Sequence, residues 1–187
     1  MRTFIAVELE PGVRRPLIKL LREVFPAERE VRWCTEQQLH ITLKFLGEIR
    51  DAQLAPVCEA VRQASGQVAP FTIRIRGLGG FPNPRNPRVL WCGVEDPAGG
   101  CRRWVELADP LLADLGFTPE SRAFTPHITL GRSRSPAGSR VFQKILETTP
   151  PPQTDMMVVR QIIVFESRLL PTGAEYKPLA TIPLAAS

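Results

Sequence analysis

The sequence predicts an α+β fold: one bilobal domain spanning residues 1–187, with two similar lobes related by a pseudo-two-fold and a cleft between them. The first indication is the tetrapeptide His-Ile-Thr-Leu, which occurs at His40 and again at His127, the only two histidines. The second is that the same offset of 87 residues aligns further strand-like and helix-like segments, giving an internal repeat of about 2–76 and 89–163. Each half then reads strand, helix, strand, helix, strand, with the tetrapeptide on the middle strand.

The first strand and the first helix of each half have clear patterns. RTFIAVE at residues 2–8 alternates like a half-buried strand, and its counterpart VLWCGVE at residues 89–95 also ends in Val-Glu. The helix that follows shows the i, i+3, i+4, i+7 spacing of one buried face. The two apolar stripes are Leu17, Leu20, Leu21 and Val24, and Trp104, Leu107, Ala108 and Leu111.

A second helix and a third strand complete each half. The helix stripes are Leu54, Val57, Cys58 and Val61, and Val141, Phe142, Ile145 and Leu146. The third strands are expected at residues 70–76 and 157–163. Glycines and prolines of GLGGFPNPRNPR, residues 77–88, mark a loop between the halves. A last strand, residues 174–184, closes the chain.

Composition excludes several classes of protein. Hydrophobic residues make up 43% and charged residues 23%, which is typical of a globular chain and argues against disorder. No apolar run approaches the ~18 residues of a membrane span, and the start lacks the apolar core of a signal peptide, so we expect a cytoplasmic protein. The net charge of +5 is compatible with an anionic ligand but too mild to demand one.

The four cysteines contain no C-x-x-C pair, so with only two histidines a zinc site is not expected. We expect reduced, inert thiols.

The repeated tetrapeptide places imidazoles and hydroxyls on one face of each middle strand. Side chains alternate along a strand, so His40, Thr42 and Lys44 are expected on a half-exposed face. The opposite face would carry Leu39, Ile41, Leu43 and Phe45 against the helices. In the second copy His127 and Thr129 point outward. Two lobes facing each other would therefore bring two imidazoles and two hydroxyls into one groove.

This set of groups suits phosphodiester chemistry without a metal. A neutral imidazole takes a proton from the attacking oxygen, and a protonated one gives a proton to the leaving oxygen. Threonine hydroxyls donate hydrogen bonds to phosphate oxygens. Packing alone explains Ile and Leu in both copies, but it gives no reason to keep His and Thr on the polar side. A two-histidine metal site lacks the third histidine or carboxylate that such sites use, and threonine is a poor zinc ligand.

These residues resemble the two-histidine (2H) phosphoesterase superfamily, with paired H-x-T-x motifs at His40–Leu43 and His127–Leu130. The match is closest to the bacterial and archaeal RNA 2′,3′-cyclic phosphodiesterase branch, also called 2′-5′ RNA ligase. The resemblance includes RWCTEQQLHITLKFLGE, GLGGFPNPRNPRVLWCGVE and FTPHITLGR and covers nearly the whole chain. It implies hydrolysis of a terminal 2′,3′-cyclic phosphate to a 2′-phosphate, without cofactor or metal, and ATP-independent 2′-5′ ligation in reverse.

The resemblance also implies residue roles. His40 would be the proton donor, His127 the proton acceptor, and Thr42 and Thr129 would hold the phosphoryl oxygens. Arg132 would contact the phosphate. Strand parity places position +5 on the inward face, so either the strand bends after Gly131 or Arg132 is a surface charge.

Three sets of residues remain open on sequence alone. Phe45, the matching +5 position, either lies against a base or packs in the core, and Tyr176 has the same two alternatives. The loop and strand arginines Arg74, Arg76, Arg85 and Arg88 could follow a phosphate backbone, but solvated surface charges are the commoner case, so they are left out of the expected site.

The expected partner is RNA ending in a 2′,3′-cyclic phosphate, turned over by a monomer that does not bind membranes. Two alternatives stay open. One is a phosphodiesterase of small cyclic nucleotides, ADP-ribose cyclic phosphate or 2′-5′ oligoadenylate. The other is a non-catalytic module that binds RNA ends.

Overall fold

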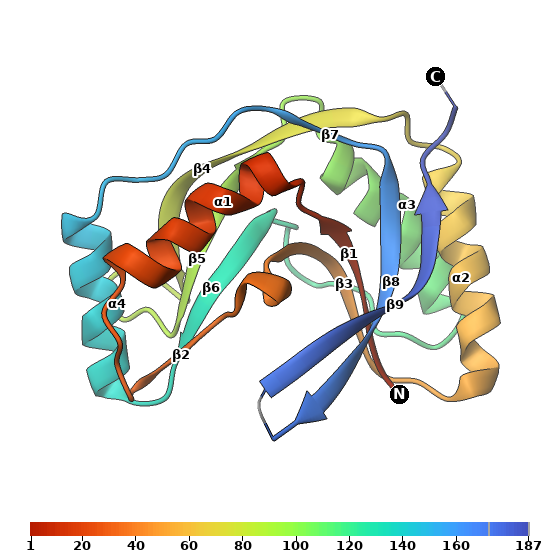
Figure 1. Ribbon diagram of the computed structural model, residues 1–187. Coiled ribbons are helices and arrows are strands. Elements are labelled where there is room, and N and C mark those ends of the chain that lie inside the picture. Colours follow the sequence, from red (N-terminus) through yellow and green to blue (C-terminus); the bar gives the residue numbers. More distant parts are fainter. Residues whose placement is uncertain (172, 187) are drawn as a thin grey trace.

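The computed structural model describes residues 1–171 and 173–186 and contains two antiparallel sheets that form the two arms of an arch (Figure 1). The first sheet has the order β3-β1-β8-β9 and the second the order β2-β6-β5-β4-β7. The strands of the first sheet are β1 (Arg2–Glu8), β3 (His40–Glu48), β8 (Gln161–Leu170) and β9 (Gly173–Pro183). Those of the second are β2 (Val31–Trp33), β4 (Phe71–Phe81), β5 (Val89–Glu95), β6 (His127–Ser133) and β7 (Met157–Val159).

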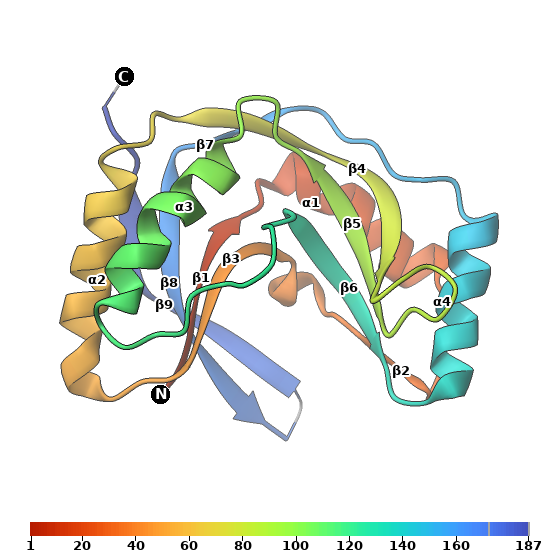
Figure 2. The same ribbon diagram turned by 180° about the vertical axis from the view of Figure 1, so that it is seen from behind.

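Four α-helices cover the outside of the arch: α1 (Pro11–Lys19), α2 (Asp51–Ser65), α3 (Gly100–Ala113) and α4 (Pro136–Thr148). Figure 2 shows α2 and α3 beside the first sheet and α1 and α4 beside the second. A π-helical turn, η1 (Leu20–Val24), follows α1, and a 3-10 turn, η2 (Glu36–Gln38), precedes β3. In the described residues no helix combines the length and apolarity needed to span a membrane. The α+β class and the bilobal arrangement expected from the sequence are confirmed.

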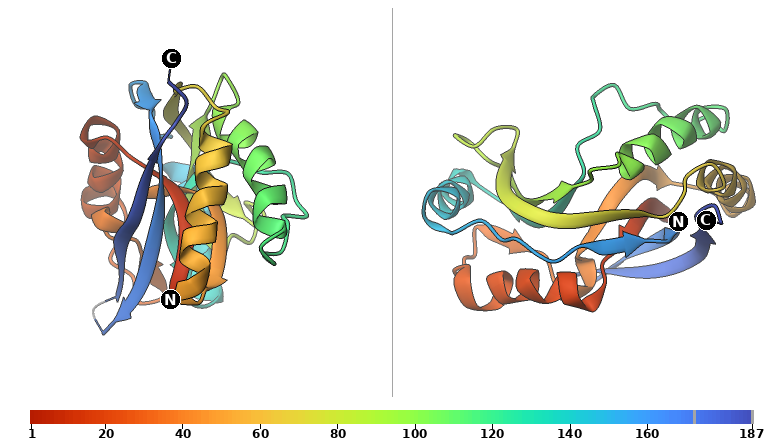
Figure 3. Two further views of the ribbon diagram at one scale, coloured as in Figure 1. Left: turned by 90° about the vertical axis from the view of Figure 1, so that its right-hand side faces the viewer. Right: turned by 90° about the horizontal axis from the view of Figure 1, so that it is seen from above.

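The two halves of the chain exchange strands. The first strand of each half, β1 or β5, is central and lies beside its own motif strand, β3 or β6. The other neighbour comes from the opposite half: β8 pairs with β1, and β4 pairs with β5. Figure 3 shows the two crossing segments passing over the top of the arch. Each lobe is therefore built from both halves of the sequence.

One buried core runs through both lobes. It contains the expected helix faces, among them Leu17, Val57, Trp104, Ala108 and Phe142. A second, smaller cluster lies on the other face of the first sheet and consists of Phe4, Ala6, Ile163 and Phe165. Alternation along β1 separates the two, because Ile5 and Val7 belong to the main core.

The expected third strands were wrong in extent. The segment 157–163 is two strands, because β7 ends at Val159 on β4 while β8 begins at Gln161 and pairs with β1. β4 continues to Phe81, five residues into the expected loop. Gly79 allows this, since a Cβ there would lie 2.2 Å from the Trp91 ring on β5.

The predicted buried face of the first helix was wrong at its last residue, Val24. Leu17 is fully buried, but Val24 is 48% exposed. The reason is that α1 ends at Lys19 and the chain continues as the wider π-helical turn, which changes the angular spacing of the stripe.

Candidate active site

Both motif strands carry the same irregularity. The pairing of β3 with β1 and that of β6 with β5 each skip the leucine of the motif, Leu43 in the first case and Leu130 in the second. These two positions are 87 residues apart, so the bulge is part of the repeat. A bulge with one extra residue inverts the in-and-out alternation that follows it.

This inversion brings the fifth residue after each histidine onto the histidine's own face. Phe45 is 48% exposed and, with Arg132, lines the same cavity as His40, Thr42 and Thr129. The parity conflict at Arg132 disappears, because the strand bulges before that residue. The core alternative for Phe45 was wrong, although Ile41 and Leu43 are buried as expected.

Lys44 was expected on the cleft face and is buried instead, with 4% exposure. Its Nζ donates to Asp109 Oδ1 at 2.5 Å and to the carbonyl oxygen of Thr118 at 2.8 Å. The bulge thus turns an ammonium inward, where it joins β3 to α3 and to the segment before β6. In the second copy the equivalent position is Gly131, where a Cβ would lie 2.7 Å from the Trp33 ring.

The cavity beside the first motif has a volume of about 240 Å³. Its described lining contains three arginines, Arg2, Arg32 and Arg132, and neither aspartate nor glutamate. The remaining lining residues are Phe4, Trp33, Cys34, Gln38, His40, Thr42, Phe45, Thr129, Ser167, Leu169, Ala174 and Tyr176. The arrangement fits an anion with an attached flat group.

His40 is held between aromatic rings. Phe4 stacks on it at 4.8 Å between centroids, and Tyr176 meets it edge-on at 5.2 Å. The ring Nε2 lies 2.9 Å from Thr42 Oγ1. Burial lowers the pKa of His40 to about 4, although a hydrogen bond to the Gln38 backbone favours the charged form. Repulsion from His127 and Arg14 lowers this pKa further.

His127 lies against Phe81, edge-on at 5.0 Å, and near Trp91 at 6.1 Å. Its Nδ1 lies 2.7 Å from the carbonyl oxygen of Thr125. A carbonyl only accepts, so Nδ1 carries the proton and Nε2 of the neutral ring keeps its lone pair. Burial lowers the pKa of His127, and the nearby Arg132 lowers it further. His127 does not itself line the cavity described above, but a positive charge on His127 would lower the pKa of His40.

Two site residues were missed by the motif analysis. Phe4 and Trp91, which pack on the two imidazoles, are separated by the same 87 residues as the histidines. Both fall in the aligned strands 2–8 and 89–95, so the repeat held the signal: an aromatic residue at the same place in each. Tyr176, left open on sequence alone, is half-buried in the cavity wall beside Phe4 and His40.

The other polar side chains give little further chemistry. All four cysteines are free, and burial raises the pKa of Cys34 in the cavity wall to about 11, which keeps it a thiol near neutral pH. Within the described part of the chain, no group of three or more His, Cys, Asp or Glu side chains is placed to hold a metal ion.

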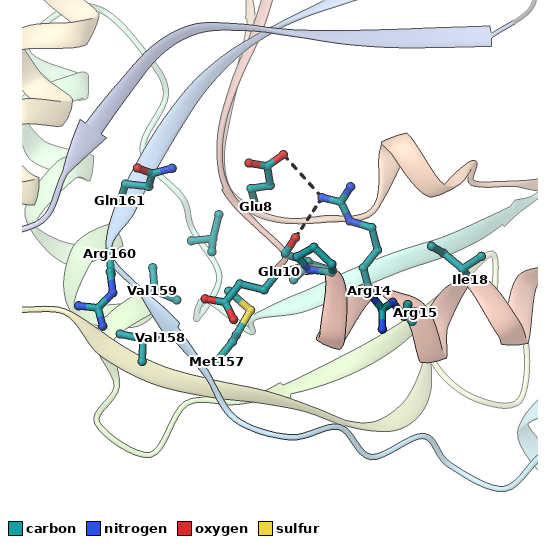
Figure 4. Close-up of a pocket in the computed structure, with 13 residues that line it drawn as sticks. Glu8, Glu10, Arg14, Arg15, Ile18, Met157, Val158, Val159, Arg160 and Gln161 are labelled. Atoms are coloured by element: carbon teal, nitrogen blue, oxygen red, sulfur yellow. Dashed lines mark hydrogen bonds and ion pairs between the residues drawn. The ribbon is translucent and has the colours of Figure 1, made fainter.

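A second hollow, of about 690 Å³, lies between the start of α1 and the β7–β8 crossing (Figure 4). It contains charges of both signs, with Glu8 and Glu10 beside Arg14, Arg15 and Arg160. Arg14 Nη2 lies 3.6 Å from Glu8 and donates to the carbonyl oxygen of Leu9 at 3.1 Å. This hollow therefore lacks the uniform positive lining of the cavity at His40.

Comparisons with known proteins agree with this geometry. The family model described as LigT-like phosphoesterase matches residues 7–91 and again residues 93–176. A protein of Methanothermobacter thermautotrophicus named RNA 2′,3′-cyclic phosphodiesterase is 31% identical over 98% of this chain and 99% of its own. One of Archaeoglobus fulgidus with the same name is 33% identical over 96% and 98%. The solved structure of TT0787 from Thermus thermophilus is 31% identical, with a TM-score of 0.82 over 98% of both chains. The chain belongs to the LigT-like phosphoesterase family.

Proposed function

We propose that this protein is a hydrolase that opens the terminal 2′,3′-cyclic phosphate of RNA and leaves a 2′-phosphate. The observation that carries the proposal is the cavity in which His40, Thr42, Thr129 and Arg132 come together without a carboxylate. The full-length relatives named RNA 2′,3′-cyclic phosphodiesterase support the substrate class.

The proposed reaction is a direct displacement by water at phosphorus. Nε2 of His127 accepts a proton as the water oxygen bonds to phosphorus. The bond from phosphorus to the 3′ oxygen breaks, and this oxygen takes a proton from His40. The products are a 2′-phosphomonoester and a free 3′-hydroxyl. His127 ends protonated and His40 neutral, so a proton returns between turnovers. No step requires a metal or a cofactor.

The protonation states follow from the surroundings of the two rings. The hydrogen bond from Nδ1 to Thr125 leaves Nε2 of His127 ready to act as a base. His40 must be protonated to act as an acid, but its pKa of about 4 keeps it neutral in the empty site near pH 7. A bound phosphodiester anion raises that pKa, because an opposite charge at close range favours the imidazolium. Substrate binding thus charges the acid.

The remaining cavity residues would hold the substrate. The hydroxyls of Thr42 and Thr129 donate to the non-bridging oxygens, and the Arg132 guanidinium neutralises their charge. Phe45 offers a ring face to a base and is itself covered by Arg2, whose guanidinium carbon lies 5.0 Å from the ring centroid.

We propose further that residues 1–187 are one domain formed by duplication of a unit of about 75 residues, 2–76 and 89–163. Equivalent strands, equivalent bulges and equivalent imidazole-packing aromatics at one offset support this. We propose that the enzyme is a monomer, because one chain supplies both motifs. Its proposed location is the cytoplasm. Light scattering tests the monomer, and cell fractionation tests the location.

The test is turnover of an RNA oligonucleotide ending in 2′,3′-cyclic phosphate, in EDTA, by the wild type, His40→Gln, His127→Gln and Arg160→Ala. Arg160 is an exposed arginine of the other hollow and serves as the surface control. We expect each histidine variant to lose about 10²–10⁴-fold in kcat, with an unchanged far-UV circular dichroism spectrum. Mass spectrometry with nuclease digestion identifies the product isomer.

A 3′-phosphate product would reverse the acid and base roles. Activity that EDTA abolishes would refute the metal-independent mechanism. Tight, salt-sensitive binding of the cyclic end without any product would indicate the binding module instead, and turnover of small cyclic phosphates alone would change the substrate class.

A further inference from the structure

Two more hollows continue the catalytic cavity along the edge of the second sheet. The first, of about 710 Å³, shares Arg32, Trp33, Gln38, Arg132 and Leu169 with the cavity at His40. The second, of about 300 Å³, shares Ser133 and Arg134 with the first and ends at Arg88 and the start of α4. The three therefore form a row of adjoining hollows that leads away from the motif, and we call this row the channel.

The channel is positively charged throughout. Arg32, Arg132, Arg134 and Arg88, which we call the arginine track, follow it in that order, and all four are exposed. No aspartate or glutamate of the described residues lines any of the three hollows. Nor does any track arginine form an ion pair with a carboxylate of residues 1–171 or 173–186.

Some other arginines of this chain lie against carboxylates. Arg74 and Arg76, which share a strand face, both bind Glu95. In the hollow of Figure 4, Glu8 and Glu10 lie among the arginines. The chain has 19 acidic residues, and none of those described lines the three hollows of the channel.

The backbone holds the track arginines together. Arg32 on β2 lies directly opposite Arg132 on β6, and directly opposite residues project from the same face of an antiparallel pair. Two like charges in this arrangement destabilise the strand pair, and a bound polyanion would offset the repulsion. Ser133 N donates to the carbonyl oxygen of Arg88 at 2.8 Å, which fixes the far end of the track beside β6.

The middle hollow also has an apolar wall. Trp33 lies on one side, and the β8 residues Leu169 and Leu170, which are 68% and 45% exposed, lie on the other. Exposed leucines beside a row of arginines offer a surface for a base next to a surface for its phosphate. The volume of this hollow is within the range of small-ligand sites, ~300–1,000 Å³.

We propose that the arginine track binds the RNA strand on the 5′ side of the cyclic phosphate. The terminal nucleotide occupies the cavity at His40, the preceding base lies in the middle hollow, and the upstream phosphates bind Arg134 and Arg88. The proposal rests on the proposed function, because it assumes that the cyclic end is the substrate. It makes the enzyme selective for oligonucleotide ends over cyclic mononucleotides.

The test compares kcat/KM for adenosine 2′,3′-cyclic phosphate with that for di-, tri- and hexaadenylate carrying the same cyclic end. In the wild type we expect kcat/KM to rise with length and then level off. Arg134→Ala and Arg88→Ala are each expected to reduce the ratio of hexanucleotide to mononucleotide kcat/KM roughly threefold to tenfold, through KM. For the hexanucleotide, log(kcat/KM) falls as log salt rises. Each variant is expected to make this slope less negative by about 0.7, because one phosphate contact is lost. Arg160→Ala is the matched control and should leave the ratio unchanged.

Equal kcat/KM for all lengths in the wild type would overturn the track, and so would an unchanged ratio in both arginine variants. Failure of the wild type to turn over any cyclic phosphate is a different result, since it would refute the proposed function itself. Far-UV circular dichroism of each variant separates lost binding from lost folding, and Arg134→Lys should restore part of the length preference because it keeps the charge.

Discussion

Replacing Asp109 by alanine should destabilise the protein chiefly because it removes the carboxylate partner of buried Lys44. Lys44 is 4% exposed, and Asp109 Oδ1, at 2.5 Å from its Nζ, is its nearest carboxylate partner. Removing one partner of a buried pair leaves an uncompensated charge, which costs about 3–5 kcal/mol. Glu120 remains at 3.9 Å and Thr118 still accepts a hydrogen bond, so we expect the lower end, about 3 kcal/mol. For a chain of this length that corresponds to a Tm lower by about 6–12 °C.

The measurement is urea and thermal unfolding of the wild type, Asp109→Ala, Lys44→Met and Lys44→Met/Asp109→Ala. Methionine fills the space of the lysine stem without a charge, so the double variant should recover most of the lost free energy of unfolding. An Asp109→Ala variant within about 0.5 kcal/mol of the wild type would refute the reasoning, as would a double variant no more stable than Asp109→Ala. The pair also ties the segment before β6 through the Glu120 amide, which donates to Asp109 Oδ2 at 3.1 Å. Loss of activity by Asp109→Ala at temperatures where it is still folded is therefore expected.

Three further predictions concern the cleft. The unfolded chain protonates His40 near its ordinary pKa of 6.5 and the folded chain only near 4, so the unfolded state binds more protons between these values. The free energy of unfolding should therefore fall as pH drops through this window, by on the order of 3 kcal/mol, and the fall should be smaller in His40→Gln; an equal fall in both proteins contradicts the neutral ring. Because kcat/KM reports the free enzyme and both histidine pKa values are lowered, its optimum should lie below pH 6.5 and decline toward alkaline pH; a flat profile to about pH 8 would exclude this pairing. Phe45→Ala should raise KM for cyclic-phosphate RNA about tenfold through lost stacking, with a change in the free energy of unfolding below about 0.5 kcal/mol because the ring is 48% exposed; an unchanged KM would remove Phe45 from the substrate.

The repeat made much of the fold and the site predictable. The offset of 87 residues located both motif strands, and strand alternation correctly put His40 and Thr42 on one face and Ile41 and Leu43 on the other. The same offset relates Phe4 to Trp91, so the repeat also predicts an aromatic residue beside each motif strand. These features depend on local sequence pattern, which a single chain records.

The bulges and the strand exchange have no comparable signal. The extra residue of the bulge is Leu43, followed by a lysine, in one strand and Leu130, followed by a glycine, in the other. Neither dipeptide indicates that the alternation of side chains is inverted there. Its effect is large, since it buries Lys44 and exposes Phe45 and Arg132. Likewise, the sequence 157–163 reads as one strand, and only the tertiary structure separates it at Arg160 between two sheets.

The exchange of β4 and β8 makes the molecule a covalently linked equivalent of a domain-swapped dimer. Each half on its own would have a sheet that lacks two strands, β8 and β9 in the first half and β2 and β4 in the second. The central strand β1 or β5 would then keep an open, aggregation-prone edge. Fragments cut between Pro82 and Arg88, in the connection from β4 to β5, should therefore be insoluble alone and should complement each other when refolded together. In the intact chain the exchanged strands join the arms to each other, which should oppose rotation of the arms as separate jaws. The proposed RNA substrate would then enter a cleft of nearly fixed width.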